Sequence, residues 1–276
     1  MQFDTSGLQL QSIAGNSGKA FKGQRSDGTP VFVKYEMPPI VSVLAREQIT
    51  PPILSANREA GMGHRVEQEW LNGRTLERQD MGSKQVRQIL VRMHYSRILL
   101  NQALQMNYTY MKPQDLVHRW QKEAPARLAQ NTYLQSICQD LLNHLPNFRQ
   151  EVATFVHGDL HHTNWVETTS GLVYLTDWET ACLTDRMLDV AYLLTHYIPR
   201  HEWKEWLQAY GYKYNQTVLS KIYWYGQLGY LNQIVKHVES YNVPAANKEI
   251  YALRQFRQSF KKDIRELEIE RELVSS

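Results

Sequence analysis

The chain has 276 residues, 42% of them hydrophobic, which is enough to bury a substantial core in one or two domains. Its 31 basic and 28 acidic residues nearly balance at a formal charge of +3, so nucleic-acid binding is not indicated. Two cysteines, Cys138 and Cys182, are too few for a disulfide framework or a cysteine-based metal cluster. No apolar run approaches the roughly 20 residues of a membrane-spanning helix, and no signal-peptide pattern opens the chain. We expect a cytoplasmic protein without membrane insertion.

Short strands separated by turns are predicted for the first 70 residues. Strand-like runs occur at 8–13, 19–23, 31–34 and 63–70. Asp27-Gly28 predicts a hairpin turn between the second and third of these runs. A Pro-rich connection at 37–40 precedes a helix that includes Glu47. This pattern is typical of a small sheet with one helix.

From Ser83 onward, apolar residues mostly recur at the three- and four-residue spacing of helices. Helices are predicted at 83–95, 113–145, 186–197, 200–210, 215–238 and 246–270. A strand-rich island at 153–177 interrupts them. Strands early and helices late predict a bilobal α+β fold of the protein-kinase-like kind, with a boundary near Asn72-Gly73. Residues 1–72 would form a small β-rich N-lobe, and 73–276 a larger, mainly helical C-lobe.

The most informative segment is HGDLHHTN, residues 157–164, followed by Asp177-Trp178-Glu179. Asn164 comes five residues after Asp159 on one short loop, and the apolar run 171–176 predicts a strand that delivers Asp177 to the same site. In phosphoryl transfer, one Asp accepts the proton of the substrate hydroxyl, and an Asn and a second Asp hold magnesium at the nucleotide phosphates. We therefore predict Asp159 as the general base, with Asn164 and Asp177 as ligands of Mg²⁺.

Three histidines in this segment, His157, His161 and His162, raise the alternative of a zinc site. Zinc would need a further ligand and a geometry that such a loop does not supply. We favour a structural explanation, in which His157 is a buried residue that braces the loop. Gly158 would provide an unusual backbone angle or close packing there.

The HGDxxxxN pattern resembles the catalytic core of the aminoglycoside phosphotransferase and choline/ethanolamine kinase superfamily, which shares its fold with protein kinases. Gly158 stands where protein kinases have Arg, and Trp178-Glu179 where they have Phe-Gly, and both differences favour a small-molecule acceptor. Further segments, among them SGKAF, LAREQI, QEWLNG and LTDRMLDVAYLL, resemble the CcrZ family of cell-cycle regulators from Gram-positive bacteria. The resemblance covers about 7–260.

The resemblance implies an ATP- and Mg²⁺-dependent kinase that phosphorylates a small-molecule alcohol. It narrows the acceptor to a nucleoside, at its ribose 5′-hydroxyl, with ethanolamine or choline as the alternative. It also implies work in cell-cycle control at the division septum and contact with the tubulin-like division protein FtsZ. A division scaffold in which catalysis is secondary is therefore the competing hypothesis.

A phosphate-binding lysine is expected at Lys34, which ends a strand of β-branched and aromatic residues. A fixed ammonium at this position would offset the charge of the nucleotide phosphates. By resemblance, the acidic partner of Lys34 is Glu47, thirteen residues later. Glu36 and Glu59 are competing partners.

Two further segments are expected to contact ATP. The turn at 15–18 takes the place of a nucleotide-covering loop, with Ser17 near the phosphates, although it lacks the ending of a Walker A motif. Glu69-Trp70-Leu71 precedes the predicted boundary and would form the interlobe hinge. Backbone groups of Glu69 and Leu71 would recognise adenine there.

Aromatic residues are dense where the acceptor is expected to bind. Trp178, Tyr192 and Trp224 could stack on a nucleobase or surround a choline-like cation, and Glu179 supplies an acidic group that favours a cation. Helix packing is the competing explanation, because aromatic residues dominate cores. Asp185 fits a helix N-cap, and Asp189 could brace the catalytic loop from that helix.

Overall fold

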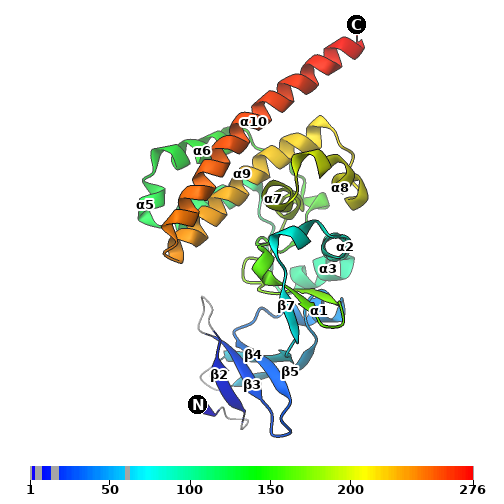
Figure 1. The fold of residues 1–276 in the computed structure, drawn as a ribbon, viewed down its shortest axis with the longest axis vertical. Helices are drawn as coiled ribbons and strands as arrows, with labels where there is room; N and C mark the ends of the chain where they lie inside the picture. The colour runs from blue at the N-terminus through cyan, green and yellow to red at the C-terminus, as the bar shows by residue number, and fades with distance from the viewer. Residues whose placement is uncertain (1, 4–7, 14–18, 60–62, 276) are drawn as a thin grey trace. The chain divides into compact units, whose positions relative to one another are not determined.

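The computed structural model describes residues 2–3, 8–13, 19–59 and 63–275. The chain forms two compact units, each built from two segments. Unit 1 comprises Met1–Tyr108 and Asp159–Ala181, and unit 2 comprises Thr109–Gly158 and Cys182–Ser276. The predicted α+β class is confirmed, with a β-rich N-terminal part and a helical C-terminal part (Figure 1). The boundary expected at Asn72-Gly73 lies inside unit 1 and stays a prediction.

Unit 1 contains a six-stranded antiparallel sheet in the order β1-β2-β3-β4-β6-β5. Its strands are β1 (Gln2–Phe3), β2 (Gln9–Ser12), β3 (Ala20–Gln24), β4 (Pro30–Tyr35), β5 (Ile53–Glu59) and β6 (Gly63–Glu69). The expected turn at Asp27-Gly28 is confirmed, because Gly28 has a φ of 84° and its N–H donates to the Arg25 carbonyl at 2.9 Å. Strand β5 was not among the predicted strands.

Side-chain alternation along β4 decides what each face of this sheet can do. Val31, Val33 and Tyr35 are buried in a cluster with Leu8, whereas the intervening Phe32 and Lys34 belong to the opposite face. The period of two therefore assigns Lys34 to a face separate from this core. A register slip of one residue would exchange the two sets.

Unit 1 also contains a second, three-stranded sheet of order β10-β9-β7 and three α-helices. The strands are β7 (Gly73–Thr75), β9 (Trp165–Thr168) and β10 (Val173–Leu175), and the helices are α1 (Val41–Arg46), α2 (Lys84–Tyr95) and α3 (Arg97–Gln105). Short 3₁₀ turns occupy η1 (Arg78–Gly82) and η3 (His162–Asn164). Helix α2 confirms the helix predicted at 83–95, and Ser83 caps it by accepting from the Val86 N–H.

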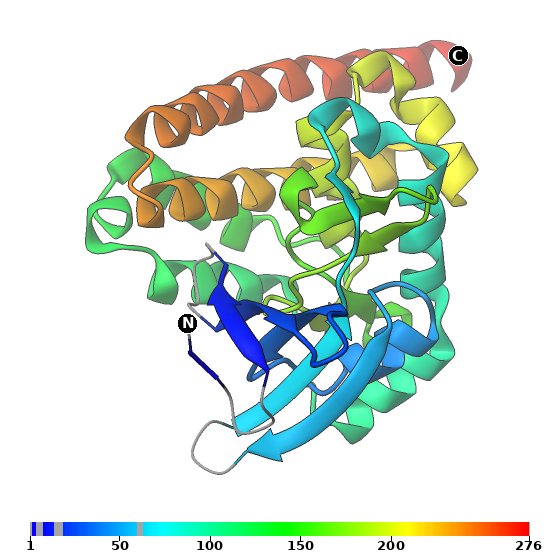
Figure 2. The same cartoon turned by 60° about the horizontal axis from the view of Figure 1, so that its bottom comes forward.

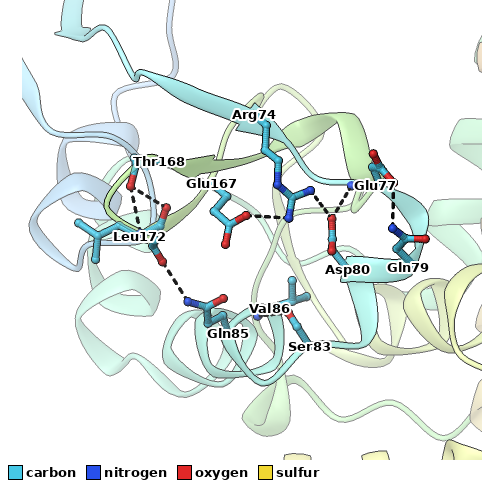
Figure 3. Close-up of polar contacts among 11 residues, drawn as sticks. Arg74, Glu77, Gln79, Asp80, Ser83, Gln85, Val86, Glu167, Thr168 and Leu172 are labelled. Atoms are coloured by element: carbon cyan, nitrogen blue, oxygen red, sulfur yellow. Dashed lines mark hydrogen bonds and ion pairs between the residues drawn. The ribbon is translucent and has the colours of Figure 1, made fainter.

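Polar contacts join these elements around Arg74 on β7 (Figure 3). Its guanidinium lies 2.6 Å from an Asp80 carboxylate oxygen and 2.7 Å from one of Glu167, which is opposite Arg74 on β9. Gln85 on α2 donates to the Gly171 carbonyl in the β9–β10 turn at 3.0 Å. The β9–β10 hairpin, which follows the segment 157–164, is thus bonded to β7 on one side and to α2 on the other.

Unit 2 is mainly helical, with a two-stranded sheet of β8 (Thr154–Val156) and β11 (Cys182–Thr184). Its helices are α4 (Pro113–Glu123), α5 (Ala126–Ala129), α6 (Thr132–Asn143), α7 (Met187–Tyr197), α8 (Trp203–Tyr210), α9 (Gln216–Glu239) and α10 (Val243–Ser275), with 3₁₀ turns η2 (Gln150–Val152) and η4 (Arg200–Glu202). Helices α9 and α10 run side by side (Figure 2). None of the helices in the described part of the chain has the length and apolarity to cross a membrane.

The single helix predicted at 113–145 is wrong, because the structure breaks it into α4, α5 and α6. Ala124 precedes Pro125 and has an extended ψ of 134°, as expected for a residue before proline. Asn131 then starts α6 afresh by accepting from the Leu134 N–H at 3.1 Å. Periodicity alone did not reveal these two interruptions.

Candidate active site

Pairing of β9 with β10 brings Asn164 next to Thr176, the residue before Asp177. Trp165 is opposite Leu175 in this antiparallel pair, so the residue before β9 and the residue after β10 also meet. The Asn164 carbonyl accepts from the Thr176 N–H at 2.8 Å and from its hydroxyl at 3.0 Å. The thirteen-residue spacing between Asn164 and Asp177 is therefore explained by a hairpin, which returns the chain to Asn164 one residue before Asp177.

Asp159 is held directly by Asn164. The Asn164 side-chain amide donates to the Asp159 carbonyl at 3.0 Å and to its carboxylate Oδ2 at 2.9 Å. Asp159 is only 7% exposed, so its carboxylate has little freedom to reorient. Because the Asn164 Nδ2 makes both bonds, the lone pairs of Asn164 Oδ1 are left to coordinate a cation.

Asp177 has a left-handed backbone with a φ of 64°. This region is uncommon for residues other than glycine, although Asp tolerates it better than most, and such conformations concentrate at functional sites. The Asp177 side chain is 49% exposed and can reach a ligand. Asp177 and Asn164 together offer carboxylate and amide oxygens, which fit Mg²⁺ completed by phosphate and water.

Lys34 on β4 joins this cluster. Its Nζ lies 3.2 Å from Asp177 Oδ1 and 3.0 Å from Glu179 Oε1, and its side chain is 13% exposed. Burial disfavours the ammonium, but the carboxylates of Asp177 and Glu179 outweigh it and raise the pKa of Lys34 above its usual value. Lys34 is therefore positively charged at any physiological pH.

The predicted ion pair between Lys34 and Glu47 is wrong for the described part of the chain. Lys34 pairs with Asp177 and Glu179 instead, and Glu47 is the C-cap residue of α1, which ends at Arg46. The Glu47 carboxylate accepts from the Ser96 hydroxyl at 3.4 Å, and its carbonyl accepts from Arg92 at 3.2 Å. Glu36 pairs with Lys19.

A cavity of about 560 Å³ in unit 1 adjoins the cluster. The residues predicted for ATP or acceptor binding that line it are Lys34, Glu69, Leu71, Asp177, Trp178 and Glu179. Ser17, expected near the phosphates, and the turn around it lie outside the described residues. Apolar atoms of Phe32, Met37 and Val166 form part of the wall.

The aromatic residues considered for acceptor binding are well packed. Trp178 is buried and donates from its indole to the Thr50 hydroxyl at 3.2 Å. In unit 2, Tyr192 stacks on His196 with ring centroids 4.2 Å apart, and Trp224 donates to the Leu141 carbonyl at 2.9 Å. These contacts favour the packing explanation for Tyr192 and Trp224, and their role as acceptor contacts stays a prediction.

The two residues before Asp159 are braced as expected. Both carboxylate oxygens of Asp189 on α7 accept backbone bonds, from the His157 N–H at 2.9 Å and from the Gly158 N–H at 2.8 Å. Asp189 and His157 are buried, and Gly158 has a φ of 79° that only glycine adopts readily. The N-cap of α7 is Arg186, one residue after the predicted Asp185, but Asp185 accepts from the Met187 N–H at 3.0 Å and pairs with Lys221.

The other two histidines make local contacts. His161 bonds through Nδ1 to the Thr163 hydroxyl at 2.7 Å, and its ring lies 4.2 Å from that of His162. Within the described ranges, no three His, Cys, Asp or Glu side chains are grouped as a metal site would need. The zinc alternative therefore gains no support from the geometry.

Two residues that line the cavity, Thr50 and Gln68, were missed at the sequence level. Thr50 accepts the indole bond of Trp178, and Gln68 donates from its side chain to the Pro51 carbonyl at 2.7 Å. No pattern in the β6 sequence GHRVEQE singles out Gln68. Its meaning depends on Pro51, which is seventeen residues away in sequence.

Comparison with known families identifies the class of protein. The model of the Phosphotransferase enzyme family (APH) matches residues 39–225, and the chain belongs to this family. The predicted class, a small-molecule kinase that transfers a phosphoryl group to an alcohol, is confirmed, and the predicted cofactors ATP and Mg²⁺ agree with it.

Solved structures of similar fold cover nearly all of the chain. Choline kinase LicA from Streptococcus pneumoniae is 16% identical with a TM-score of 0.62, and the match covers 90% of this chain and 94% of LicA. Plasmodium vivax ethanolamine kinase is 14% identical with a TM-score of 0.64, over 92% and 83%. A GDP complex of aminoglycoside 2′-phosphotransferase-IIIa is 11% identical with a TM-score of 0.59, over 91% and 93%. These likenesses confirm the protein-kinase-like fold.

Proposed function

We propose that this phosphotransferase transfers the γ-phosphoryl group of ATP to a small-molecule hydroxyl at the cluster around Asp159. The observation that carries the proposal is the convergence of Asp159, Asn164, Asp177 and Lys34, in which Lys34 and Asp177 meet although they are 143 residues apart in sequence. Each offers the chemistry that one part of phosphoryl transfer requires. The site residues are thus proposed together, as one unit.

Asp159 acts as the general base in this proposal. Its carboxylate orients the acceptor hydroxyl and takes the proton as the oxygen attacks phosphorus, while the bond to Asn164 keeps one orientation. Asn164 Oδ1 and the Asp177 carboxylate would hold Mg²⁺, which when bound neutralises charge that develops on the phosphates. The left-handed backbone of Asp177, a conformation that concentrates at functional sites, supports this assignment.

Lys34 supplies the second positive charge. With no nucleotide bound, Asp177 and Glu179 neutralise it, and their carboxylates maintain its protonated state. Phosphate oxygens entering the cavity would replace one of these carboxylates as the partner of Lys34. Glu47 is proposed to support the site through Ser96 and Arg92 rather than through Lys34.

The cavity supports nucleotide binding by its size and lining. Its volume of about 560 Å³ is within the usual range for ligand sites, which is ~300–1,000 Å³. Leu71 lines it just beyond β6, and its backbone N–H and carbonyl bond to no other described residue. Glu69 and Leu71 are therefore proposed to receive the base through backbone groups, and Ser17 to contact the phosphates.

For the acceptor, we propose a nucleoside, phosphorylated at its ribose 5′-hydroxyl, on the strength of the family resemblance in the sequence. Choline or ethanolamine is the second candidate, favoured by the fold shared with the choline and ethanolamine kinases and by the acidic Glu179 beside the site. Trp178 and Glu179 would be acceptor contacts in this site.

A panel of nucleosides and amino alcohols, incubated with γ-labelled ATP and Mg²⁺, tests this assignment. Label transferred to a nucleoside is the expected result. Transfer only to choline or ethanolamine would make the amino alcohol, and not the nucleoside, the acceptor. Absence of transfer to every alcohol, by protein that binds ADP, would contradict phosphotransfer at this site.

The link to the cell cycle is proposed on the same resemblance, with FtsZ as the partner and the division septum as the place. Catalysis and scaffolding predict different outcomes in a cell that depends on this protein. If chemistry matters, the Asp159→Ala variant will not restore normal division. Restoration by this variant would assign the main role to scaffolding.

A further inference from the structure

One polar side chain in the nucleotide cavity has an orientation that the surrounding backbone determines. Gln68 lines the cavity, is 4% exposed and lies opposite Phe32 of β4. The charged residues of the site, Lys34, Asp177 and Glu179, contact one another, whereas Gln68 contacts the Pro51 carbonyl. Gln68 is thus a neutral polar group beside apolar wall residues.

The Pro51 carbonyl determines which atom of the Gln68 amide is Nε2 and which is Oε1. The contact measures 2.7 Å, and a carbonyl can only accept, so the atom facing Pro51 is the Nε2 donor. Residue 52 is also proline, so this stretch of backbone has no N–H that could take the place of the Gln68 amide. The usual ambiguity between the oxygen and nitrogen of a glutamine is therefore resolved here.

The remaining atom, Gln68 Oε1, is an acceptor on the other side of the amide. In the described part of the chain it receives no hydrogen bond. A nearly buried acceptor is stabilised by a ligand that donates to it and is opposed by a ligand that presents another acceptor. Rotating the amide to relieve such a clash would break the bond to Pro51.

Purine bases differ in this respect at position 6. Adenine has an exocyclic amino group, which donates, whereas guanine and hypoxanthine have a carbonyl oxygen, which accepts. We propose that Gln68 is a specificity-determining residue, whose Oε1 selects a 6-amino purine nucleotide against a 6-oxo one. The inference rests on the proposed function, since it requires that the cavity bind the nucleotide.

Binding of nucleoside diphosphates to the full chain with Mg²⁺, measured by calorimetry, tests the inference without an identified acceptor. The probes are ADP, inosine diphosphate and the diphosphate of unsubstituted purine riboside, which lacks any group at position 6. Wild-type protein should bind ADP at least tenfold more tightly than inosine diphosphate, with the unsubstituted purine between them. Equal affinity for ADP and inosine diphosphate would overturn the inference and leave the proposed function standing.

The Gln68→Leu variant removes the acceptor at nearly constant volume. Its preference for ADP over inosine diphosphate should fall to about threefold or less, mainly through weaker binding of ADP. Gln24→Leu on β3 is the matched control, because Gln24 belongs to the same sheet but does not line this cavity. A wild-type preference in Gln68→Leu would overturn the inference. If wild type binds neither nucleotide, the proposed function falls and this inference with it.

Discussion

The two faces of the six-stranded sheet in unit 1 differ in chemistry, although the same strands build both. On one face, Phe32, Lys34 and Gln68 line the cavity. On the other, Val31, Val33 and Tyr35 form a buried cluster, and Glu67 on β6 lies opposite Val33. Because side chains alternate along a strand, a residue that lines the cavity and a residue that stabilises the core can be direct neighbours in sequence.

In this sheet, the position of a residue along its strand predicts the effect of a substitution better than the residue type does. Charged residues occur on both faces, yet their surroundings differ. Lys34 pairs with partly exposed carboxylates beside the cavity. Glu67 is buried and pairs with Arg65 at 2.8 Å and Arg25 at 2.7 Å. Substitutions on the cavity face should therefore reduce activity, and those on the core face should reduce stability.

Among substitutions in this sheet, the largest effect is expected for Lys34→Met on the cavity face. Methionine keeps the apolar stem but removes the ammonium, so turnover with ATP and the best acceptor should fall by about 10²–10³-fold. The melting temperature should change little, because the partner carboxylates of Asp177 and Glu179 are about half exposed. Steady-state kinetics and thermal unfolding on the same preparation check both statements, and an active variant would remove Lys34 from the proposed site.

On the core face, Glu67→Gln should reduce the free energy of unfolding by about 3 kcal/mol near neutral pH, because a neutral amide replaces the carboxylate that pairs with the buried Arg65 guanidinium. Burial opposes the charge of Glu67, but Arg25 and Arg65 more than offset this and lower the pKa of Glu67 below 4.5. The stabilisation is therefore present above pH 4.5 and is lost as pH falls through the pKa of the folded state. Denaturant titrations of both proteins from pH 3 to 7 should show the difference between them shrinking below pH 4.5. A constant difference would contradict this account.

Val33→Ala on the same face should reduce the free energy of unfolding by about 2 kcal/mol, since it deletes fully buried methyl groups from the cluster around Leu8. The affinity for ADP should stay within about threefold of wild type, because Val33 does not line the cavity. Urea unfolding and ADP binding measure the two quantities. A loss of affinity much larger than the loss of stability would show that the two faces are not independent.

The smallest effect is expected for Thr50→Val, which removes the acceptor of the Trp178 indole bond without changing the shape of the side chain. Trp178 follows Asp177 directly, so a looser indole should raise the Mg²⁺ concentration for half-maximal activity by about three- to tenfold. Thr50→Ser is the control, because it retains the hydroxyl. Identical Mg²⁺ dependence in Thr50→Val and wild type would limit the role of this bond to packing.

The grouping of Asp159, Asn164 and Asp177 could be predicted from the sequence because their spacing is local. Asp159 and Asn164 share one loop, and the hairpin that follows returns the chain to Asp177. The bracing by Asp189 was also predicted, although the His157 and Gly158 N–H groups lie 32 and 31 residues away from it in sequence. The β-rich to helical change in pattern was sufficient for the fold class.

Contacts across long sequence separations were not predictable in the same way. Glu47 was assigned to Lys34 by family resemblance, but Lys34 pairs with Asp177 and Glu179, and Glu47 accepts from Ser96. The amide of Gln68 is oriented by its bond to the Pro51 carbonyl. The hydroxyl of Thr50 accepts from Trp178, which is 128 residues away in sequence. Such relations depend on which carbonyl or hydroxyl lies beside a side chain, and only the folded chain determines that.

Asp159→Asn gives the most direct test of phosphotransfer at this cluster. Asparagine keeps the shape of the side chain but cannot accept the proton, so turnover should fall by about 10²–10⁴-fold. Binding of ADP with Mg²⁺ and the melting temperature, measured on the same protein, should remain close to wild type. Turnover at the wild-type rate by Asp159→Asn would contradict the central claim that Asp159 is the base.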